Sequence, residues 1–299
     1  MRGSLEVAGQ VLVLIFVLST LFSVGLLVSA RQLLVALQQR GSLAVALLAN
    51  FVVLPAAGLA LCRWLQLAPP LQGALLLVVT APGSPALLRL NELARGDQAK
   101  AVGLLVLLTS PTVVYQPLMP QLLPGLSVSP VPIARILVVT VLLPLVFGLL
   151  LKARWPALAR RLRPALARLG NVSAILSCFV FLPLMYLDAL KHMVLNGEGL
   201  LVLLLYLPLA AGAGWWLGRS DAEQRRLLTL CCGQGSMGAA FVIATHNFDN
   251  PHVIAMLLLV LWFSLALLIP LALVCRRQSL GAATSLSERS GLTHPPSKT

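Results

Sequence analysis

Residues 81–85 read Ala-Pro-Gly-Ser-Pro and residues 232–238 read Cys-Gly-Gln-Gly-Ser-Met-Gly, and each stretch interrupts a long apolar segment. Prolines remove backbone hydrogen-bond donors and clash with the preceding turn, and glycines relax the chain, so no straight helix runs through either stretch. Backbone that is unwound inside a membrane must be buried in protein or line a wet cavity. The sequence therefore predicts two interrupted helices at the centre of a membrane protein.

Apolar segments of membrane-spanning length recur along the chain from residue 9 to residue 275. Hydrophobic residues make up 59% of the 299 residues and charged residues only 10%, whereas a soluble domain carries about 25% charged residues. A run of about 18 apolar residues is long enough to cross a bilayer as a helix. This pattern predicts an all-α polytopic membrane protein, and it excludes water-soluble enzymes and nucleic acid as a partner. We assign nine spans, at residues 9–29, 42–64, 69–95, 98–123, 130–152, 168–187, 198–217, 223–247 and 250–275.

The basic residues gather on one side of this predicted membrane. The net charge is +13, and 18 of the 22 lysines and arginines lie in alternate loops or in the carboxyl tail. Cytoplasmic loops carry such an excess, so we expect the amino terminus outside and the tail in the cytoplasm of an inner or plasma membrane. The most basic segment, 152–168, is expected to be a loop that contacts anionic lipid headgroups. Residues 279–299 are rich in Ser, Thr and Pro and predict a disordered tail.

The two interrupted spans, 69–95 and 223–247, cross the membrane in opposite directions in this topology. Each is third in its group of four spans, which indicates inverted repeats with 130–152 as the unpaired span. Paired interruptions in two inverted halves point to the binding site of a transporter. Gln116, inside an apolar span, either lines the same cavity or bonds a neighbouring backbone. The candidate binding residues in the two breaks are Pro82, Gly83, Ser84, Pro85, Gly233, Gln234, Gly235 and Ser236.

Three stretches resemble the bile acid:sodium symporter family: APGSPALLRLNELARGD at 81–97, LLTSPTVVYQPLMPQLLPG at 107–125 and CCGQGSMGAAFVIATHNF at 231–248. The resemblance covers residues 9 to 275 and is to the nine-helix form that lacks the first helix. It implies a transporter domain over 9–275 that works by alternating access and carries an organic anion or amphipathic solute. A core of residues 69–123 and 198–275 would contain the two interrupted stretches, which we call the breaks. A panel of residues 9–64 and 130–187 would rock against this core.

At the positions that correspond to the family's sodium sites, this chain departs from the family's pattern. The positions that match sodium-binding side chains are Leu87, Leu88, Ala101, Leu105 and Leu230, which offer no oxygen to a hard cation. Gln234 matches the family's glutamine, and Thr109 matches one hydroxyl position and is a further candidate site residue. We therefore expect no sodium coupling through the family's side-chain sites. Coupling to protons and uncoupled diffusion stay open, since all nine acidic residues lie in or near loops.

Other classes of function fit the residues less well. A metalloid efflux carrier of related fold is the main alternative, with adjacent Cys231 and Cys232 as its chemical hint. A channel needs a ring of carbonyls or charges at a pore. An intramembrane hydrolase would need Ser236 beside His246, but ten helical residues separate them by about 15 Å. We expect no enzyme activity, no cofactor and no metal site, since the five cysteines lack the spacing of metal ligands.

Overall fold

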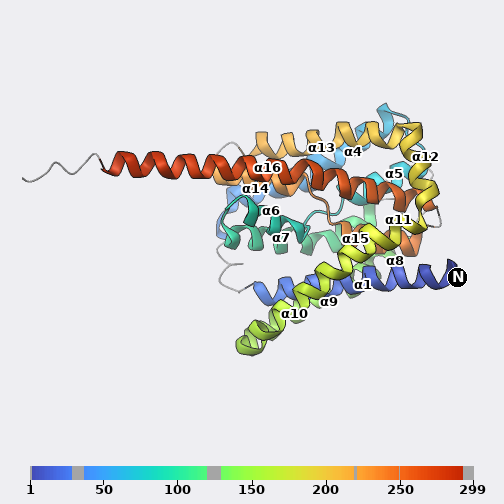
Figure 1. Ribbon diagram of the computed structural model, residues 1–299, viewed down its shortest axis with the longest axis horizontal. Helices are drawn as coiled ribbons and strands as arrows, with labels where there is room; N and C mark the ends of the chain where they lie inside the picture. The colour runs from blue at the N-terminus through green and yellow to red at the C-terminus, as the bar shows by residue number, and fades with distance from the viewer. Residues whose placement is uncertain (1, 29–36, 120–128, 219–220, 249, 292–299) are drawn as a thin grey trace, which may run out of the picture.

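The computed structural model describes residues 2–28, 37–119, 129–218, 221–248 and 250–291 (Figure 1). Regular structure in these residues is helical throughout, which confirms the predicted all-α class. The helices are α1 (Arg2–Leu27), α3 (Arg40–Leu48), α4 (Leu54–Trp64), α5 (Pro69–Val79), α6 (Ala86–Leu93), α7 (Gln98–Leu118), α8 (Pro130–Leu137), α9 (Leu143–Arg154), α10 (Pro156–Ile175), α11 (Leu182–Met185), α12 (Leu187–Asn196), α13 (Glu198–Leu217), α14 (Ala222–Cys232), α15 (Met237–Asn247) and α16 (Pro251–Gly291).

Three of the long helices contain a wider, π-helical turn. These turns are Ala49–Val53 between α3 and α4, Val138–Leu142 between α8 and α9, and Leu176–Phe181 between α10 and α11. In each case a proline is the second residue of the helix that follows. Proline has no N–H and its ring clashes with the carbonyl four residues earlier, so the turn before it widens without ending the helix.

Eight helical segments in the described residues are long and apolar enough to cross a membrane. The expected span 69–95 is not among them, because the structure divides it into the short helices α5 and α6. A polytopic helical fold is therefore confirmed. The count of nine stays an interpretation that treats α5 and α6 as one interrupted span.

Two expected irregular segments are helical in the structure. Only Trp155 separates α9 from α10, so the basic segment 152–168 is not a loop: its residues belong to the end of α9 and the first turns of α10. Alanine, leucine and arginine dominate this stretch and favour a helix. We expect a disordered tail from residue 279, but α16 continues to Gly291 through a stretch that contains alanine and leucine. Residues 292–299 lie outside the described part.

The helices pack in two groups. The first group is formed by α1, α9 and α10, which lie together at one edge of the bundle (Figure 1). Glycines permit close approach there: a Cβ on Gly148 would lie 2.8 Å from Gly25 Cα, and a Cβ on Gly170 would lie 2.5 Å from Thr20 Oγ1. Because the helices approach backbone to backbone at Gly148 and backbone to side chain at Gly170, the first group is a tightly joined unit.

The second group contains α3 to α7 and α13 to α16, and it corrects the expected position of residues 42–64. We assigned that span to the panel with α1, but α4 packs against α5 and α13, and α3 packs against α7. Polar side chains explain the placement, since Tyr115 on α7 donates to the carbonyl of Phe51 at 2.7 Å. Asn50 also reaches across to Cys232 Sγ at 3.7 Å. The span 42–64 thus belongs with the helices that carry the breaks.

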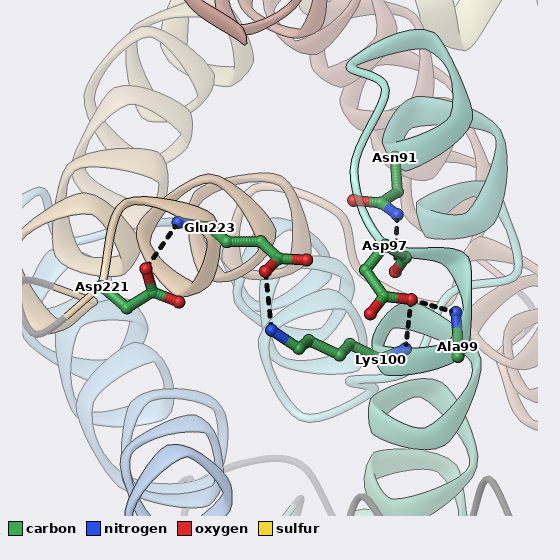
Figure 2. Close-up of polar contacts among 6 residues, drawn as sticks. All are labelled: Asn91, Asp97, Ala99, Lys100, Asp221 and Glu223. Atoms are coloured by element: carbon green, nitrogen blue, oxygen red, sulfur yellow. Dashed lines mark hydrogen bonds and ion pairs between the residues drawn. The ribbon is translucent and has the colours of Figure 1, made fainter. Parts of the chain in front are cut away.

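A polar network joins the first turns of α7 and α14 (Figure 2). Asp97 caps α7 by accepting from the N–H groups of Ala99 at 2.7 Å and Lys100 at 3.3 Å. Asp221 caps α14 by accepting from the N–H of Glu223 at 3.3 Å. The Lys100 ammonium and the Glu223 carboxylate then form an ion pair at 2.6 Å between the two helices. The network holds the amino-terminal ends of α7 and α14 together at one end of the molecule.

The ends of the chain lie at opposite ends of the bundle, where α1 begins at one end and α16 runs out at the other (Figure 1). We therefore expect Glu6→Cys and Ser285→Cys to react with a membrane-impermeant maleimide from opposite sides of the membrane. The five native cysteines are buried and give a low background. Labelling of both engineered sites from one side would contradict the topology.

Candidate functional site

The two helix breaks lie directly against each other. Helix α5 ends at Val79 and α6 begins at Ala86, while α14 ends at Cys232 and α15 begins at Met237. The N–H of Ser236 donates a hydrogen bond to the carbonyl of Ala81 at 2.6 Å. This confirms the prediction that two segments about 150 residues apart in sequence meet at their interruptions.

Glycines make this contact possible. Gly83 has a φ of +89°, a conformation that a residue with a side chain rarely adopts. A Cβ there would collide with Thr109 Oγ1 and lie 2.9 Å from Thr109 N. On the other break, a Cβ on Gly235 would lie 2.8 Å from the carbonyl oxygen of Val78. A larger residue at position 83 would push the first break away from α7, and one at position 235 would push the second break away from the end of α5.

Helix α7 supplies hydrogen-bond donors to the first break. Thr109 donates to the carbonyl of Gly83 at 3.2 Å, and Thr112 donates to the carbonyl of Pro82 at 3.3 Å. Gln116 Nε2 donates to the carbonyl of Leu77 at 3.1 Å. These three residues follow a spacing of three and four, so they lie on one face of α7. Sequence reasoning missed Thr112, although this spacing in an apolar helix would have found it.

Two buried glutamines of the site, Gln116 and Gln234, each have a side-chain oxygen without a hydrogen-bond partner among the described residues, and Gln234 is the one that lies in a break. Gln234 also borders a void of about 10 Å³ together with Asn50 and Tyr206. A void of that size is just large enough for one water molecule. The site therefore presents a buried, neutral acceptor without a donor.

A cavity of about 420 Å³ extends from the breaks to one end of the molecule. Helices α1 and α10 form one wall, and the breaks with α6 form the opposite wall. Of the predicted residues, Ser84, Pro85, Gln234 and Ser236 line it. Pro82, Gly233 and Gly235 instead border the small void. Gly83, Thr109 and Gln116 line neither; Thr109 bonds the first break, and Gln116 bonds the last turns of α5.

The positions that resemble sodium ligands are packed as apolar core. Leu87, Ala101 and Leu230 are at most 1% exposed and belong to one hydrophobic cluster. Leu105 is equally buried in a neighbouring cluster, and Leu88 lines the cavity. Side-chain oxygens are missing from all five positions, and carbon atoms fill the space around the four fully buried ones.

The cysteine pair does not form a joint site. Cys231 belongs to the same apolar cluster as Leu230, whereas Cys232 belongs to the main core cluster on another face of α14. Within the described part of the chain, no group of three His, Cys, Asp or Glu residues could hold a metal ion. The hint of metalloid chemistry in the sequence gains no support from this arrangement.

A polytopic helical bundle in which two broken helices meet beside a cavity has the architecture of a secondary transporter. The Sodium Bile acid symporter family matches residues 11–189, more than half of the chain, and the protein belongs to this family. It is also 27% identical over 240 residues, 78% of this chain, to a probable chloroplastic sodium/metabolite cotransporter of Oryza sativa subsp. japonica. The match spans 56% of the length of that relative. The chain is thus a multi-pass membrane protein of a symporter family.

We expect Gly83→Ala to destabilise the crossing, because the new methyl group clashes with Thr109 and a left-handed conformation is strained for alanine. A cost of 2–3 kcal/mol corresponds to a fall of roughly 5–10 °C in the midpoint of thermal unfolding. The measurement is a thermal-shift assay on the purified protein in detergent. Gly212→Ala on α13 is the matched control, since nothing lies within 4 Å of its Cβ. Equal midpoints for the two variants would refute this account of the crossing.

Proposed function

We propose that this protein moves an organic anion or amphipathic solute across the membrane by alternating access. The observation that carries the proposal is the cavity of about 420 Å³ between the group α1, α9 and α10 and the group that holds the breaks. A solute in this cavity would touch both groups at once. Movement of one group against the other would then expose the bound solute first to one side of the membrane and then to the other.

The lining of the cavity supports this class of solute. Its walls are mainly apolar side chains of α1, α10 and α16. Its polar atoms come from the breaks, from the exposed end, and from Thr20, Ser23 and Asn171 on the walls. The first residues of α6 and α15, Ala86 and Met237, line it too. The amino-terminal end of a helix carries partial positive charge and favours negative groups. An apolar body with a negative group suits these surroundings.

The orientation follows from the distribution of charge. The cavity reaches the exposed residues Arg89, Glu92 and Arg163, which lie at the basic end of the bundle. By the positive-inside rule this end faces the cytoplasm of an inner or plasma membrane, with the amino terminus outside. The structure then corresponds to the state that is open to the cytoplasm.

Sodium coupling through the family's side-chain sites is not part of the proposal. Burying a cation without ligands to replace its water costs tens of kcal/mol in the Born limit, and Leu87, Ala101 and Leu230 replace the ligands by carbon. The remaining neutral oxygens near Gln234 carry no charge to offset a cation.

We predict that uptake of a labelled bile acid, such as taurocholate, into liposomes containing the purified protein is saturable and independent of a sodium gradient. The physical reason is the apolar packing at the former ligand positions. Uptake is measured with an imposed sodium gradient, an imposed proton gradient and neither, and liposomes without protein give the background.

Two outcomes would contradict parts of this proposal. Sodium-stimulated uptake that Gln234→Ala abolishes would show that a sodium site has been rebuilt around the second break. Absence of saturable uptake under all three conditions would show that a bile acid is not carried, and repeating the assay with smaller organic anions would then test the wider class.

A further inference from the structure

We propose that Arg163 on α10 selects anionic solutes at the mouth of the cavity by binding their carboxylate or sulfonate. This inference rests on the proposed function and adds a residue that neither the sequence motifs nor the breaks point to. It concerns the exposed end of the cavity, whereas the breaks lie at its buried end.

One face of α10 points into the cavity along its length. The lining residues of this segment include Arg163, Ala167, Asn171, Ala174 and Cys178. Their separations of four, four, three and four residues describe a single helical stripe. Arg163 is the outermost member, so its side chain lies at the entrance, and the smaller residues behind it leave room for a solute.

The other charged residues that line the cavity are paired with each other. Arg89 and Glu92 are the remaining charged residues that line the cavity, and they form an ion pair with each other at 3.4 Å. Nearby Lys152 donates from Nζ to the carbonyl of Leu27 at 2.5 Å, at the end of α1. Arg163 takes part in neither of the two ion pairs found among the described residues, Arg89–Glu92 and Lys100–Glu223. Lys152 keeps its positive charge, because the Leu27 carbonyl is neutral, but it does not line the cavity. Among the described residues that line the cavity, Arg163 carries the one positive charge without a carboxylate partner.

The geometry also sets the dimensions of the solute. From Ser84 at the first break to Arg89 and Glu92 on α6, five to eight residues rise about 8–12 Å. Arg163 lines the same end of the cavity as Arg89 and Glu92. The lining thus fits an amphipathic anion whose charged group reaches Arg163 while its apolar body extends toward the breaks.

A pair of fluorescent probes can separate charge from hydrophobic shape. Anilinonaphthalene sulfonate is an anionic amphipath, and phenylnaphthylamine has the same aromatic frame without the charge. Both would be titrated into the full-length protein in nanodiscs of phosphatidylcholine, with empty nanodiscs as the background. We expect Arg163→Gln to raise the Kd of the anionic probe about tenfold and to leave that of the neutral probe unchanged, because a charge-assisted hydrogen bond is lost.

Matched variants define the site. Arg161→Gln removes an equally exposed arginine of α10 that does not line the cavity, and it should change neither affinity. Arg163→Lys should keep most of the preference for the anion. Ala167→Trp fills the cavity one turn further in and should abolish saturable binding of both probes. Binding that survives Ala167→Trp would place the probes elsewhere and overturn the proposal.

The remaining outcomes distinguish this inference from the proposed function. If Arg161→Gln and Arg163→Gln lose the same affinity for the anionic probe, the effect comes from general surface charge. That result would overturn the role of Arg163, although the cavity would still bind amphipaths. Wild-type protein that binds neither probe would count against the inference and the proposed function together. The titration would be repeated in nanodiscs that contain phosphatidylglycerol. If the wild-type protein then binds the anionic probe only as weakly as Arg163→Gln does, lipid headgroups occupy Arg163, and this outcome also overturns the proposal.

Discussion

The structure depends on one constraint: backbone that leaves the helical hydrogen-bond pattern inside a membrane must find its partners within the protein. The bond from the Ser236 N–H to the Ala81 carbonyl satisfies a group from each break at once. Thr109, Thr112 and Gln116 then satisfy carbonyls on the first break and on α5. An unpaired peptide group in such surroundings costs several kcal/mol, so these contacts decide where α7 must lie.

The same contacts bear on how the crossing is held together. In a sodium site, oxygen ligands from several helices converge on the ion and join the helices through it. Here Leu87, Ala101 and Leu230 converge on one another in an apolar cluster, and hydrogen bonds between backbone and neutral side chains join the breaks. Apolar packing thus links α6, α7 and α14 at these positions, and hydrogen bonds join the two breaks.

Sequence reasoning located the breaks because Pro and Gly act on the backbone locally, so their effect is visible without knowledge of the neighbours. It placed residues 42–64 in the wrong group because that depends on long-range contacts, such as Tyr115 with Phe51, which no local pattern encodes. Residues 152–168 are predicted as a loop because they lie between two assigned spans, yet arginine is a good helix former and the segment is helical. The role of Arg163 was hidden among its basic neighbours, since only the direction of each side chain distinguishes them.

The contacts within and between the two groups differ in kind, and this difference bears on movement. Inside the first group, glycines bring backbone onto backbone, as at Gly25 and Gly148. Across the groups, α1 meets α15 through apolar atoms: a Cβ on Gly238 would lie 2.9 Å from Val17 Cγ2. No hydrogen bond joins α1 to α15 in the part of the chain that the structure describes. Apolar surfaces can slide without leaving polar groups unpaired, whereas breaking a backbone contact or a hydrogen bond carries a penalty. Relative motion therefore costs least at the boundary that contains the cavity.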